Sequence, residues 1–325
     1  MTFALPDHWV WDFWIADDGT IFHLYYLHAP RSLGDPHLRH RNAAIGHATS
    51  DDLITWTDHG PVIGPGRAGE ADASAAWTGS VIRDDAAGLW RMFYTGSRFP
   101  SPSDDANIES IVAASSRDLH DWDTASGAAL EADPRWYELL GSGTWHEQAW
   151  RDPWVVADPR GGWHMLLTAR AAEGADERDR GVIGHAVSED LLRWEARPPL
   201  SRPGSGFAHL EVVQWVLVEG RPVVVFSCDA EHLAGERAAD GARGGVWAVP
   251  AGEIGTEIGV ESATLLTDES IYAGRIARSR SGEWVLLGFE NVGERGEFVG
   301  RLSDPLPLRW TTQGQLVCRV DEVVR

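Results

Sequence analysis

The stretch "SDDLITW" at positions 50–56 recurs further along the chain, and its copies indicate the fold. The second copy is "SRDLHDW" at 116–122 and the third is "SEDLLRW" at 188–194. All three read Ser-x-Asp-Leu-x-x-Trp, and a looser copy, "SDPLPLRW", ends at Trp310. Internal repetition is typical of solenoids and propellers, in which each repeat is one supersecondary unit.

Each copy of the motif closes a similar series of short strands. A first apolar strand is followed by a turn, a second strand and a third strand, and the motif then leads into a fourth, outer strand. The expected first strands are "WVWDFWI" (9–15), "AWTGSVI" (76–82), "RDPWVV" (151–156), "LEVVQWVLV" (210–218) and "IYAGRIA" (271–277). Five such units predict an all-β fold, a single five-bladed β-propeller over residues 1–325 with four antiparallel strands per blade.

The motif itself is predicted to be structural. Its Ser and Asp side chains can close a turn by accepting backbone hydrogen bonds, and its Leu and Trp can pack between blades. The fourth unit lacks the motif and is expected to be the least regular. Because the first strands of a propeller surround its axis, residues at their beginnings converge on one face although they are far apart in sequence.

Charge and composition exclude several classes of function. The 325 residues carry a formal net charge of −21, from 49 acidic and 28 basic side chains, which argues against charge-driven binding of nucleic acid or an anionic membrane. Every basic residue is an arginine, which excludes lysine Schiff-base chemistry and a P-loop lysine. No apolar run is long enough for a membrane helix and no export signal is visible, so we expect a cytoplasmic protein.

No spacing of potential ligands matches a zinc or calcium motif, and we expect neither a cofactor nor a metal ion. Cys228 and Cys318 do not form a ligand pair, and we expect both as free thiols. His47 and His185 both occupy "GHA" in equivalent third strands. This equivalence marks the two histidines as part of the repeat.

Charged residues are scarce on the predicted inner strands, and three carboxylates stand out there. Asp12 lies within "WVWDFW", Asp152 follows Arg151 in "RDPWVV", and Glu211 stands in "LEVVQW". The propeller would bring all three to the axis. Two carboxylates that flank a glycosidic bond are the minimum set for glycoside hydrolysis, and clustering of like charges raises the pKa of at least one. The chain also has 17 tryptophans, whose flat faces suit sugar rings.

Other carboxylates near predicted strand ends compete for the role of the acid, namely Glu147, Glu231 and Glu290. Glu147 is the nearest rival of Glu211. Its surroundings, "WHEQAW", also offer His146 and Gln148 as further substrate contacts.

The segments "WDFW", "WTGS", "FYTG", "RDPWV" and "LEVVQ", together with the repeats, resemble the β-fructosidase superfamily, which comprises glycoside hydrolase families 32 and 68. Members of these families are retaining enzymes on five-bladed propellers that cleave or transfer β-fructofuranosyl groups. The resemblance implies that Asp12 is the nucleophile, Asp152 the transition-state stabiliser and Glu211 the general acid/base. It also implies a fructosyl pocket lined by Trp11, Trp14, Trp77, Thr78, Arg151 and Tyr272.

The sequence departs from the family 32 pattern at three places. The segment Asn-Asp-Pro-Asn-Gly is absent, and "WDFW" is closer to the family 68 form. Val212 stands where family 32 usually has a cysteine after the acid/base glutamate. We expect no C-terminal β-sandwich, because the chain ends soon after the fifth predicted blade.

Together these features predict a retaining glycoside hydrolase or transferase. Its expected partner is a small carbohydrate, with β-fructofuranosyl linkages of sucrose or short fructo-oligosaccharides cleaved through a covalent fructosyl-enzyme intermediate. One alternative is an inverting arabinanase or xylosidase of the family 43 type, which shares the three-carboxylate plan. Another is a propeller that binds carbohydrate without cleaving it.

Overall fold

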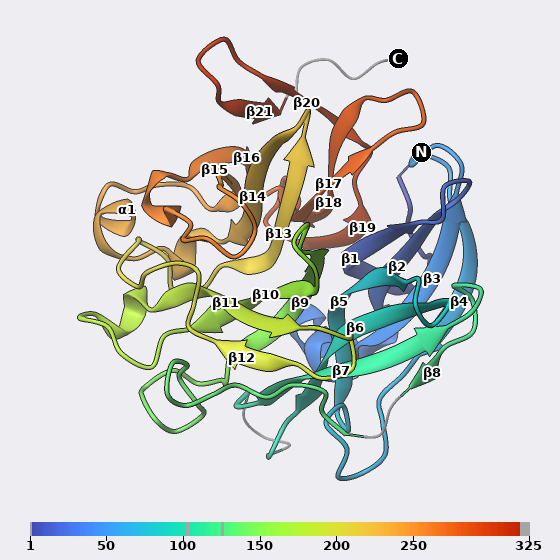
Figure 1. Ribbon diagram of the computed structural model, residues 1–325, viewed down its shortest axis with the longest axis horizontal. Coiled ribbons are helices and arrows are strands. Elements are labelled where there is room, and N and C mark those ends of the chain that lie inside the picture. The colour runs from blue at the N-terminus through green and yellow to red at the C-terminus, as the bar shows by residue number, and fades with distance from the viewer. Residues whose placement is uncertain (1, 102–104, 125–126, 319–325) are drawn as a thin grey trace.

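Five antiparallel sheets surround a central axis in the computed structural model, which describes residues 2–101, 105–124 and 127–318 (Figure 1). The strands of each sheet are consecutive in the sequence, so each sheet is one blade. The first strand of each blade lies nearest the centre, and β1 contacts both β5 and β17, which closes the ring. The predicted all-β, five-bladed propeller is confirmed.

The strands of the first three blades follow the predicted order. The first blade consists of β1 (His8–Asp17), β2 (Phe22–Pro30), β3 (Ala44–Ser50) and β4 (Thr57–Ile63). The second consists of β5 (Ala75–Asp84), β6 (Leu89–Arg98), β7 (Ile108–Ser116) and β8 (Asp123–Thr124). The third consists of β9 (Trp150–Ala157), β10 (Trp163–Arg170), β11 (Gly181–Ser188) and β12 (Glu195–Arg197).

The last two blades complete the ring. The fourth consists of β13 (Glu211–Val218), β14 (Arg221–Cys228), β15 (Gly245–Pro250) and β16 (Thr264–Asp268). The fifth consists of β17 (Ile271–Arg278), β18 (Trp284–Val292), β19 (Phe298–Leu302), β20 (Leu306–Trp310) and β21 (Leu316–Cys318). Cys228 and Cys318 are both free thiols, as expected.

Helices are short and lie in the connections between strands. The α-helix is α1 (Gly235–Ala239), and the 3₁₀ turns are η1 (Arg31–Leu33), η2 (Pro36–Asn42), η3 (Glu177–Asp179), η4 (Ala230–His232) and η5 (Val260–Ser262). None of the helices in the described part of the chain has the length and apolar character needed to cross a bilayer.

The repeated motif forms the predicted turn. In the first copy, Ser50 Oγ accepts the backbone N–H of Leu53 at 2.9 Å, and Asp52 Oδ1 accepts those of Ile54 and Thr55 at 2.8 and 2.7 Å. Leu53 is buried and adopts a positive φ of 66°, which lets the chain reverse while its side chain enters the core. The same bonds recur at 116–121 and 188–193.

The tryptophan of the motif packs between blades, as predicted. The ring of Trp122, in the second blade, meets that of Tyr25, in the first, edge-on at 5.6 Å. The ring of Trp194, in the third blade, meets that of Phe93, in the second, at 5.2 Å. Each motif therefore joins its own blade to the preceding one.

The looser copy of the motif, at 303–310, forms a strand instead of the turn. Residues 306–310 are β20, and both β19 and β20 pair with β18. Pro305 and Pro307 account for the difference. Pro305 takes the place of the aspartate that accepts the turn hydrogen bonds, and Pro307 has no backbone N–H to donate.

The core is divided among the junctions between blades. The buried apolar side chains of the described residues form five clusters, one between each pair of neighbouring blades. The cluster that joins the fifth blade to the first includes Phe3, whose carbonyl accepts the backbone N–H of Leu302 at 2.9 Å. The residues before β1 therefore help to close the ring.

Candidate active site

The inner strand of every blade has a break in its pairing register at a corresponding position. Its pairing with the second strand slips at Val10/Phe13, Trp77/Gly79, Arg151/Trp154, Glu211/Gln214 and Tyr272/Arg275. Such β-bulges re-aim the neighbouring side chains and are frequent beside active sites. Three bulge residues, Asp152, Val212 and Ala273, have positive φ values of 57°, 55° and 49°, a conformation that costs about 1–3 kcal/mol per residue outside glycine.

The five blades can be aligned on the strand pairs that follow each bulge. This alignment identifies two equivalent positions on the inner strand of every blade. The first position is held by Trp11, Trp77, Arg151, Glu211 and Tyr272. The second is held by Asp12, Thr78, Asp152, Val212 and Ala273. The two aspartates therefore occupy the second position of their blades, whereas Glu211 occupies the first.

Asp12 lies at the bulge of β1 and is half-buried. Thr78 Oγ1 donates a hydrogen bond of 2.7 Å to Asp12 Oδ2. Burial and the nearby charges of Asp152 and Glu211 raise the pKa of Asp12 to about 7, although the Thr78 hydroxyl opposes this rise. Asp12 is therefore a carboxyl group that can keep its proton close to neutral pH.

Asp152, in β9, is buried, and its Oδ2 atom receives two hydrogen bonds. Thr168 Oγ1 donates at 2.7 Å and the backbone N–H of Val212 at 3.0 Å. Burial, followed by the charge of Glu211, raises the pKa of Asp152, while Arg151 opposes the rise. Val212 N–H reaches Asp152 because the bulge of β13 turns it toward the third blade.

Glu211 stands at the beginning of β13 with both carboxylate oxygens bonded. Arg151 Nη2 donates to Oε1 at 2.8 Å, and the Tyr272 hydroxyl donates to Oε2 at 2.6 Å. Burial raises the pKa of Glu211, but His209, Arg151 and the Tyr272 bond together hold it far below its ordinary value. Burial lowers the pKa of His209 itself to about 4, so Arg151 and Tyr272 are the contributors that persist at neutral pH.

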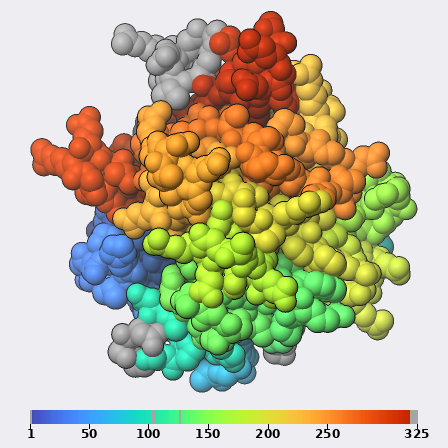
Figure 2. Space-filling view, turned by 90° about the vertical axis from the view of Figure 1, so that its left-hand side faces the viewer, coloured from blue at the N-terminus to red at the C-terminus, as the bar shows by residue number. Residues whose placement is uncertain are grey.

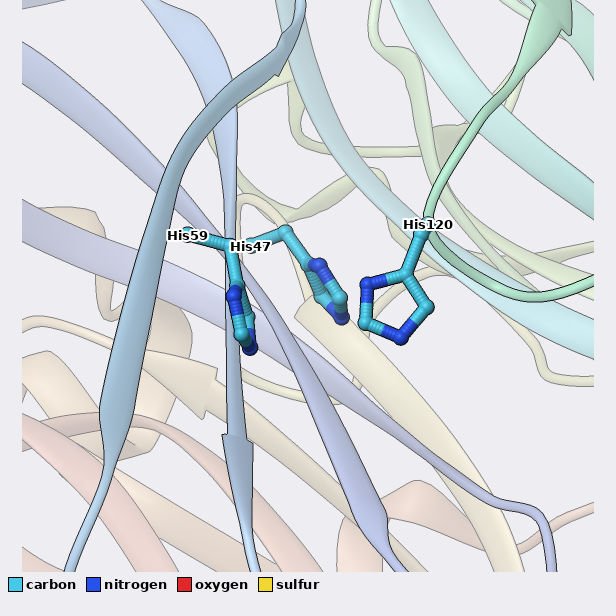
Figure 3. A group of neighbouring side chains, drawn as sticks. All are labelled: His47, His59 and His120. Atoms are coloured by element: carbon cyan, nitrogen blue, oxygen red, sulfur yellow. The ribbon is translucent and has the colours of Figure 1, made fainter.

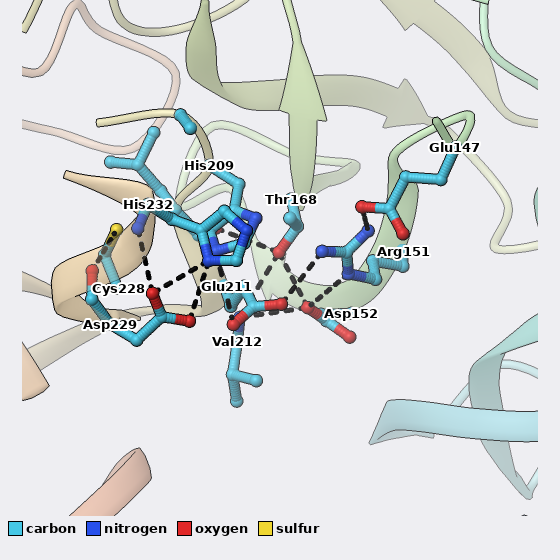
Figure 4. A network of polar contacts seen from close by, with 12 residues as sticks. Glu147, Arg151, Asp152, Thr168, His209, Glu211, Val212, Cys228, Asp229 and His232 are labelled. Atoms are coloured by element: carbon cyan, nitrogen blue, oxygen red, sulfur yellow. Dashed lines mark hydrogen bonds and ion pairs between the residues drawn. The ribbon is translucent and has the colours of Figure 1, made fainter. Parts of the chain in front are cut away.

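Arg151 is the centre of an ion-pair network that Figure 4 shows beside Glu211 and Asp152. Its Nη1 donates to Glu147 at 2.8 Å and to Glu109 at 3.1 Å, on the opposite side from its bond to Glu211. Glu109 is fully buried and also accepts the backbone N–H of Trp150. Burial, more than any nearby charge, raises the pKa of Glu109 to about 8.

The three rival carboxylates lie in different surroundings. Although burial opposes it, Arg151 lowers the pKa of Glu147 to about 2, so Glu147 is an anion bound to that arginine. Glu231 is exposed on η4. Glu290 pairs with Arg301 at 2.6 Å. None of the three is among the groups that perturb Asp12, whereas Asp152 and Glu211 are.

Trp11, Trp77 and Tyr272 hold the first position of their blades. Trp77 Nε1 donates to the carbonyl of His40 at 2.8 Å, and the His40 ring meets the rings of Trp77 and Trp11 edge-on at 6.2 and 6.4 Å. Thr78 and Tyr272 contact the carboxylates directly. Trp11 and Trp77 therefore form an aromatic corner beside Asp12.

Trp14, also predicted to line the pocket, belongs to the same buried cluster as Trp11, Trp77 and Tyr272. It has no exposed surface and stacks on Tyr25 at 5.8 Å, within the cluster between the first two blades. The residue lies beyond the bulge of β1, where its side chain enters the core. With no exposed surface in this structure, Trp14 supports β1 through packing in the core.

The two polar residues predicted from "WHEQAW" differ in their exposure to solvent. His146 is exposed, and its Nε2 lies 3.9 Å from Glu147. Gln148 is buried and donates from Nε2 to the backbone carbonyl of Glu109 at 3.2 Å. His146 thus lies at the surface, whereas Gln148 holds the strand that carries Glu109.

Several residues of the site were not predicted from the sequence. Arg39, on η2, has its pKa lowered to about 10 by burial, an effect that the charges of Asp12 and Glu211 oppose. Arg275 is buried and donates to the carbonyls of Val212 and Val213, the bulge of β13. Glu109 had a visible signal, a lone acid in the apolar stretch "IESIV". Arg39 had none, because it lies in a connection whose path only the fold defines.

The sequence pattern of the glycosyl hydrolases family 32 N-terminal domain matches residues 14–292. The chain belongs to this family. The matched region begins two residues after Asp12 and includes Asp152, Glu211 and Tyr272.

Two curated relatives share part of the chain. Over 203 residues it is 29% identical to sucrose-6-phosphate hydrolase of Escherichia coli, which covers 59% of this chain and 39% of the relative. Over 196 residues it is 26% identical to fructan 6-exohydrolase of Beta vulgaris, which covers 57% of this chain and 28% of the relative. The chain thus matches well under half the length of either protein.

Solved structures share the fold over nearly the whole chain. The inulosucrase of Halalkalicoccus jeotgali bound to kestose superposes with a TM-score of 0.76 at 24% identity, covering 97% of this chain and 87% of that one. A family 32 β-fructofuranosidase of Bombyx mori superposes with a TM-score of 0.74 at 17% identity, covering 98% of this chain and 64% of that one.

Proposed function

We propose that the protein is a retaining glycoside hydrolase or transferase that acts on β-fructofuranosyl linkages of sucrose or short fructo-oligosaccharides. The observation that carries the proposal is the meeting of Asp12, Asp152 and Glu211, from three different blades, within one electrostatically coupled group. Membership of family 32 supports it, as does the similarity to a sucrose-6-phosphate hydrolase and a fructan 6-exohydrolase.

Each carboxylate has a distinct role in this reaction. Asp12 attacks the anomeric carbon of the fructosyl unit, and Glu211 gives a proton to the departing oxygen. Water or a second sugar then resolves the covalent intermediate, with Glu211 acting as the base. Asp152 is held rigidly by Thr168 and the N–H of Val212, which suits a group that binds sugar hydroxyls and stabilises positive charge in the transition state.

The reaction requires a proton on Glu211, whereas the free site favours a proton on the aspartates. Burial and neighbouring charges raise the pKa of Asp12 to about 7 and that of Asp152 above its ordinary value, whereas the pKa of Glu211 is lowered. Because the three carboxylates interact, a proton is shared within the group, and the reactive form needs no more protons than the free site. Substrate hydroxyls that donate to Asp12 and Asp152 would favour their ionised forms and move the proton to Glu211.

A substrate panel with product identification tests the proposal. The native chain and Asp12→Ala are incubated with sucrose, sucrose 6-phosphate, fructo-oligosaccharides, levan, inulin and arabinan. We expect the native chain to release or transfer fructose, and Asp12→Ala to be inactive while folded by circular dichroism. Unchanged turnover in Asp12→Ala, or cleavage of arabinan alone, would overturn the assignment.

The stereochemistry of the first product separates the proposal from an inverting enzyme. A covalent intermediate on Asp12 leads to retention of the β configuration, which proton NMR can follow before mutarotation. Binding of a sugar without any cleavage across the panel would support the non-catalytic alternative.

A further inference from the structure

Four histidines meet at the junction between the first and second blades. They are His23 on β2, His47 on β3, His59 on β4 and His120 in the motif turn after β7. The ring of His47 lies 5.2 Å from that of His23, 5.0 Å from that of His59 and 4.8 Å from that of His120, between centroids. Figure 3 shows the rings of His47, His59 and His120 gathered at one point.

Two of these histidines belong to the propeller repeat. His23 Nδ1 lies 3.0 Å from His47 Nε2, and the third blade has the same stacked pair, with His164 Nδ1 2.8 Å from His185 Nε2. The repeat explains this buried pair, as the sequence suggests. It does not explain His59 and His120, because the residue that pairs with His185 in the neighbouring outer strand is Arg197.

The hydrogen bonds leave one nitrogen of His47 available. Its Nδ1 has no hydrogen-bond partner among the described residues, although the side chain is fully buried. If Nε2 carries the proton, it donates to His23 Nδ1, and His23 Nε2 then directs its own proton toward Asp18, 3.8 Å away. This chain of donors resembles the outer partners that orient metal-bound histidines.

His59 is arranged in the same way. Its Nε2 lies 2.8 Å from Thr49 Oγ1, which leaves Nδ1 for another contact. His59 and His120 are exposed, so their rings can move. One ring nitrogen from each of His47, His59 and His120 already lies within 4.8 Å of the other two.

We propose that His47, His59 and His120 bind a divalent transition-metal ion such as Zn²⁺. Zinc bonds to histidine are about 2.0–2.1 Å long, so the three nitrogens need to approach by only about 1 Å to share one ion. A set of imidazoles without a carboxylate ligand suits zinc, copper or nickel and not magnesium or calcium. The ion would tie the outer strand of the first blade to the motif turn of the second.

Metal binding to the whole chain tests the proposal without any measurement of turnover. The protein is dialysed against EDTA and then buffer, and Zn²⁺ is titrated by isothermal calorimetry. We expect the stoichiometry of His59→Ala and His120→Ala to be one ion lower than that of the native chain. Both side chains are exposed, so these variants should fold. His37→Ala, at an exposed histidine elsewhere, should keep the native stoichiometry.

A second group of potential ligands provides the decisive comparison. His209, Asp229 and His232 also bring one ligand atom each within 4.8 Å, next to Glu211. Loss of all Zn²⁺ binding in His232→Ala, with native stoichiometry in His120→Ala, would place the ion there and overturn the proposal. The absence of Zn²⁺ binding by the native chain would overturn it too. Co²⁺ absorption in the native chain, reduced in His120→Ala, would support nitrogen ligation at the proposed site.

Discussion

Thr78 Oγ1 donates a 2.7 Å hydrogen bond to Asp12 Oδ2, although the two residues occupy equivalent positions on neighbouring inner strands. The third blade has a related contact, in which Thr168 donates to Asp152 at the same distance. Each aspartate of the site therefore faces one threonine hydroxyl. Because the bond favours the ionised carboxylate, it lowers the pKa of Asp12 against the effect of burial, which raises it to about 7.

The pH dependence of kcat/KM should reveal this bond. We expect kcat/KM on sucrose to fall as the pH rises through about 7, because the three carboxylates then lose the proton that the reaction requires. Thr78→Val removes a donor to ionised Asp12, raises the pKa and should move this alkaline limb to higher pH. Thr267→Val, at a buried threonine on β16, is the control. An alkaline limb at the same pH in Thr78→Val as in the native chain would contradict the assignment of this limb to Asp12.

Replacement of Glu211 tests its role as the acid. Glu211→Gln should lower kcat/KM on sucrose by about 10²–10⁴-fold, the usual contribution of general acid–base catalysis. The loss should be far smaller on an aryl β-fructofuranoside, whose leaving group needs little protonation. Equal losses on both substrates would argue against proton donation by Glu211. Asp12→Asn should be inactive on both.

The raised pKa of Asp12 predicts a stability effect with a defined sign. In the unfolded chain the carboxyl loses its proton near its ordinary pKa of 3.8, whereas the folded chain keeps it to about 7. This group therefore lowers the free energy of unfolding as the pH rises from about 4 to 7. Asp12→Asn removes the effect, so its Tm should match the native Tm near pH 4 and exceed it above pH 7. Asp51→Asn, at an exposed position, should show no such divergence.

The buried pair of Arg151 and Glu147 should behave as a unit. Arg151→Gln leaves the Glu147 anion without its cation and should lower the free energy of unfolding by about 3–5 kcal/mol at pH 7. Glu147→Gln in the same chain removes the uncompensated charge and should restore part of the loss. A double-mutant cycle by urea unfolding measures the coupling. Additive effects of the two replacements would show that the pair is not coupled.

Much of the fold can be predicted from local sequence patterns. The Ser-x-Asp-Leu-x-x-Trp turn depends on hydrogen bonds between residues two or three positions apart, so its copies at 50–56, 116–122 and 188–194 are recognisable without any tertiary contact. The copy at 303–310 was misleading because two prolines remove the turn's acceptor and donor. The five repeated series of strands predicted the number of blades, and the blades predicted that Asp12, Asp152 and Glu211 would meet.

The sequence by itself thus determined the blade count, the identity of the three carboxylates and the strands that carry them, because periodic burial and turn chemistry are local. Only the tertiary structure showed that the pKa of Asp12 is raised whereas that of Glu211 is lowered, and that Trp14 belongs to the core. It alone showed that Glu211 lies one position earlier in its blade than the aspartates, and that Glu109, Arg39 and Arg275 complete the site. Those properties depend on bulge geometry, burial and charges from other blades, and electrostatic coupling between residues distant in sequence has no local signature.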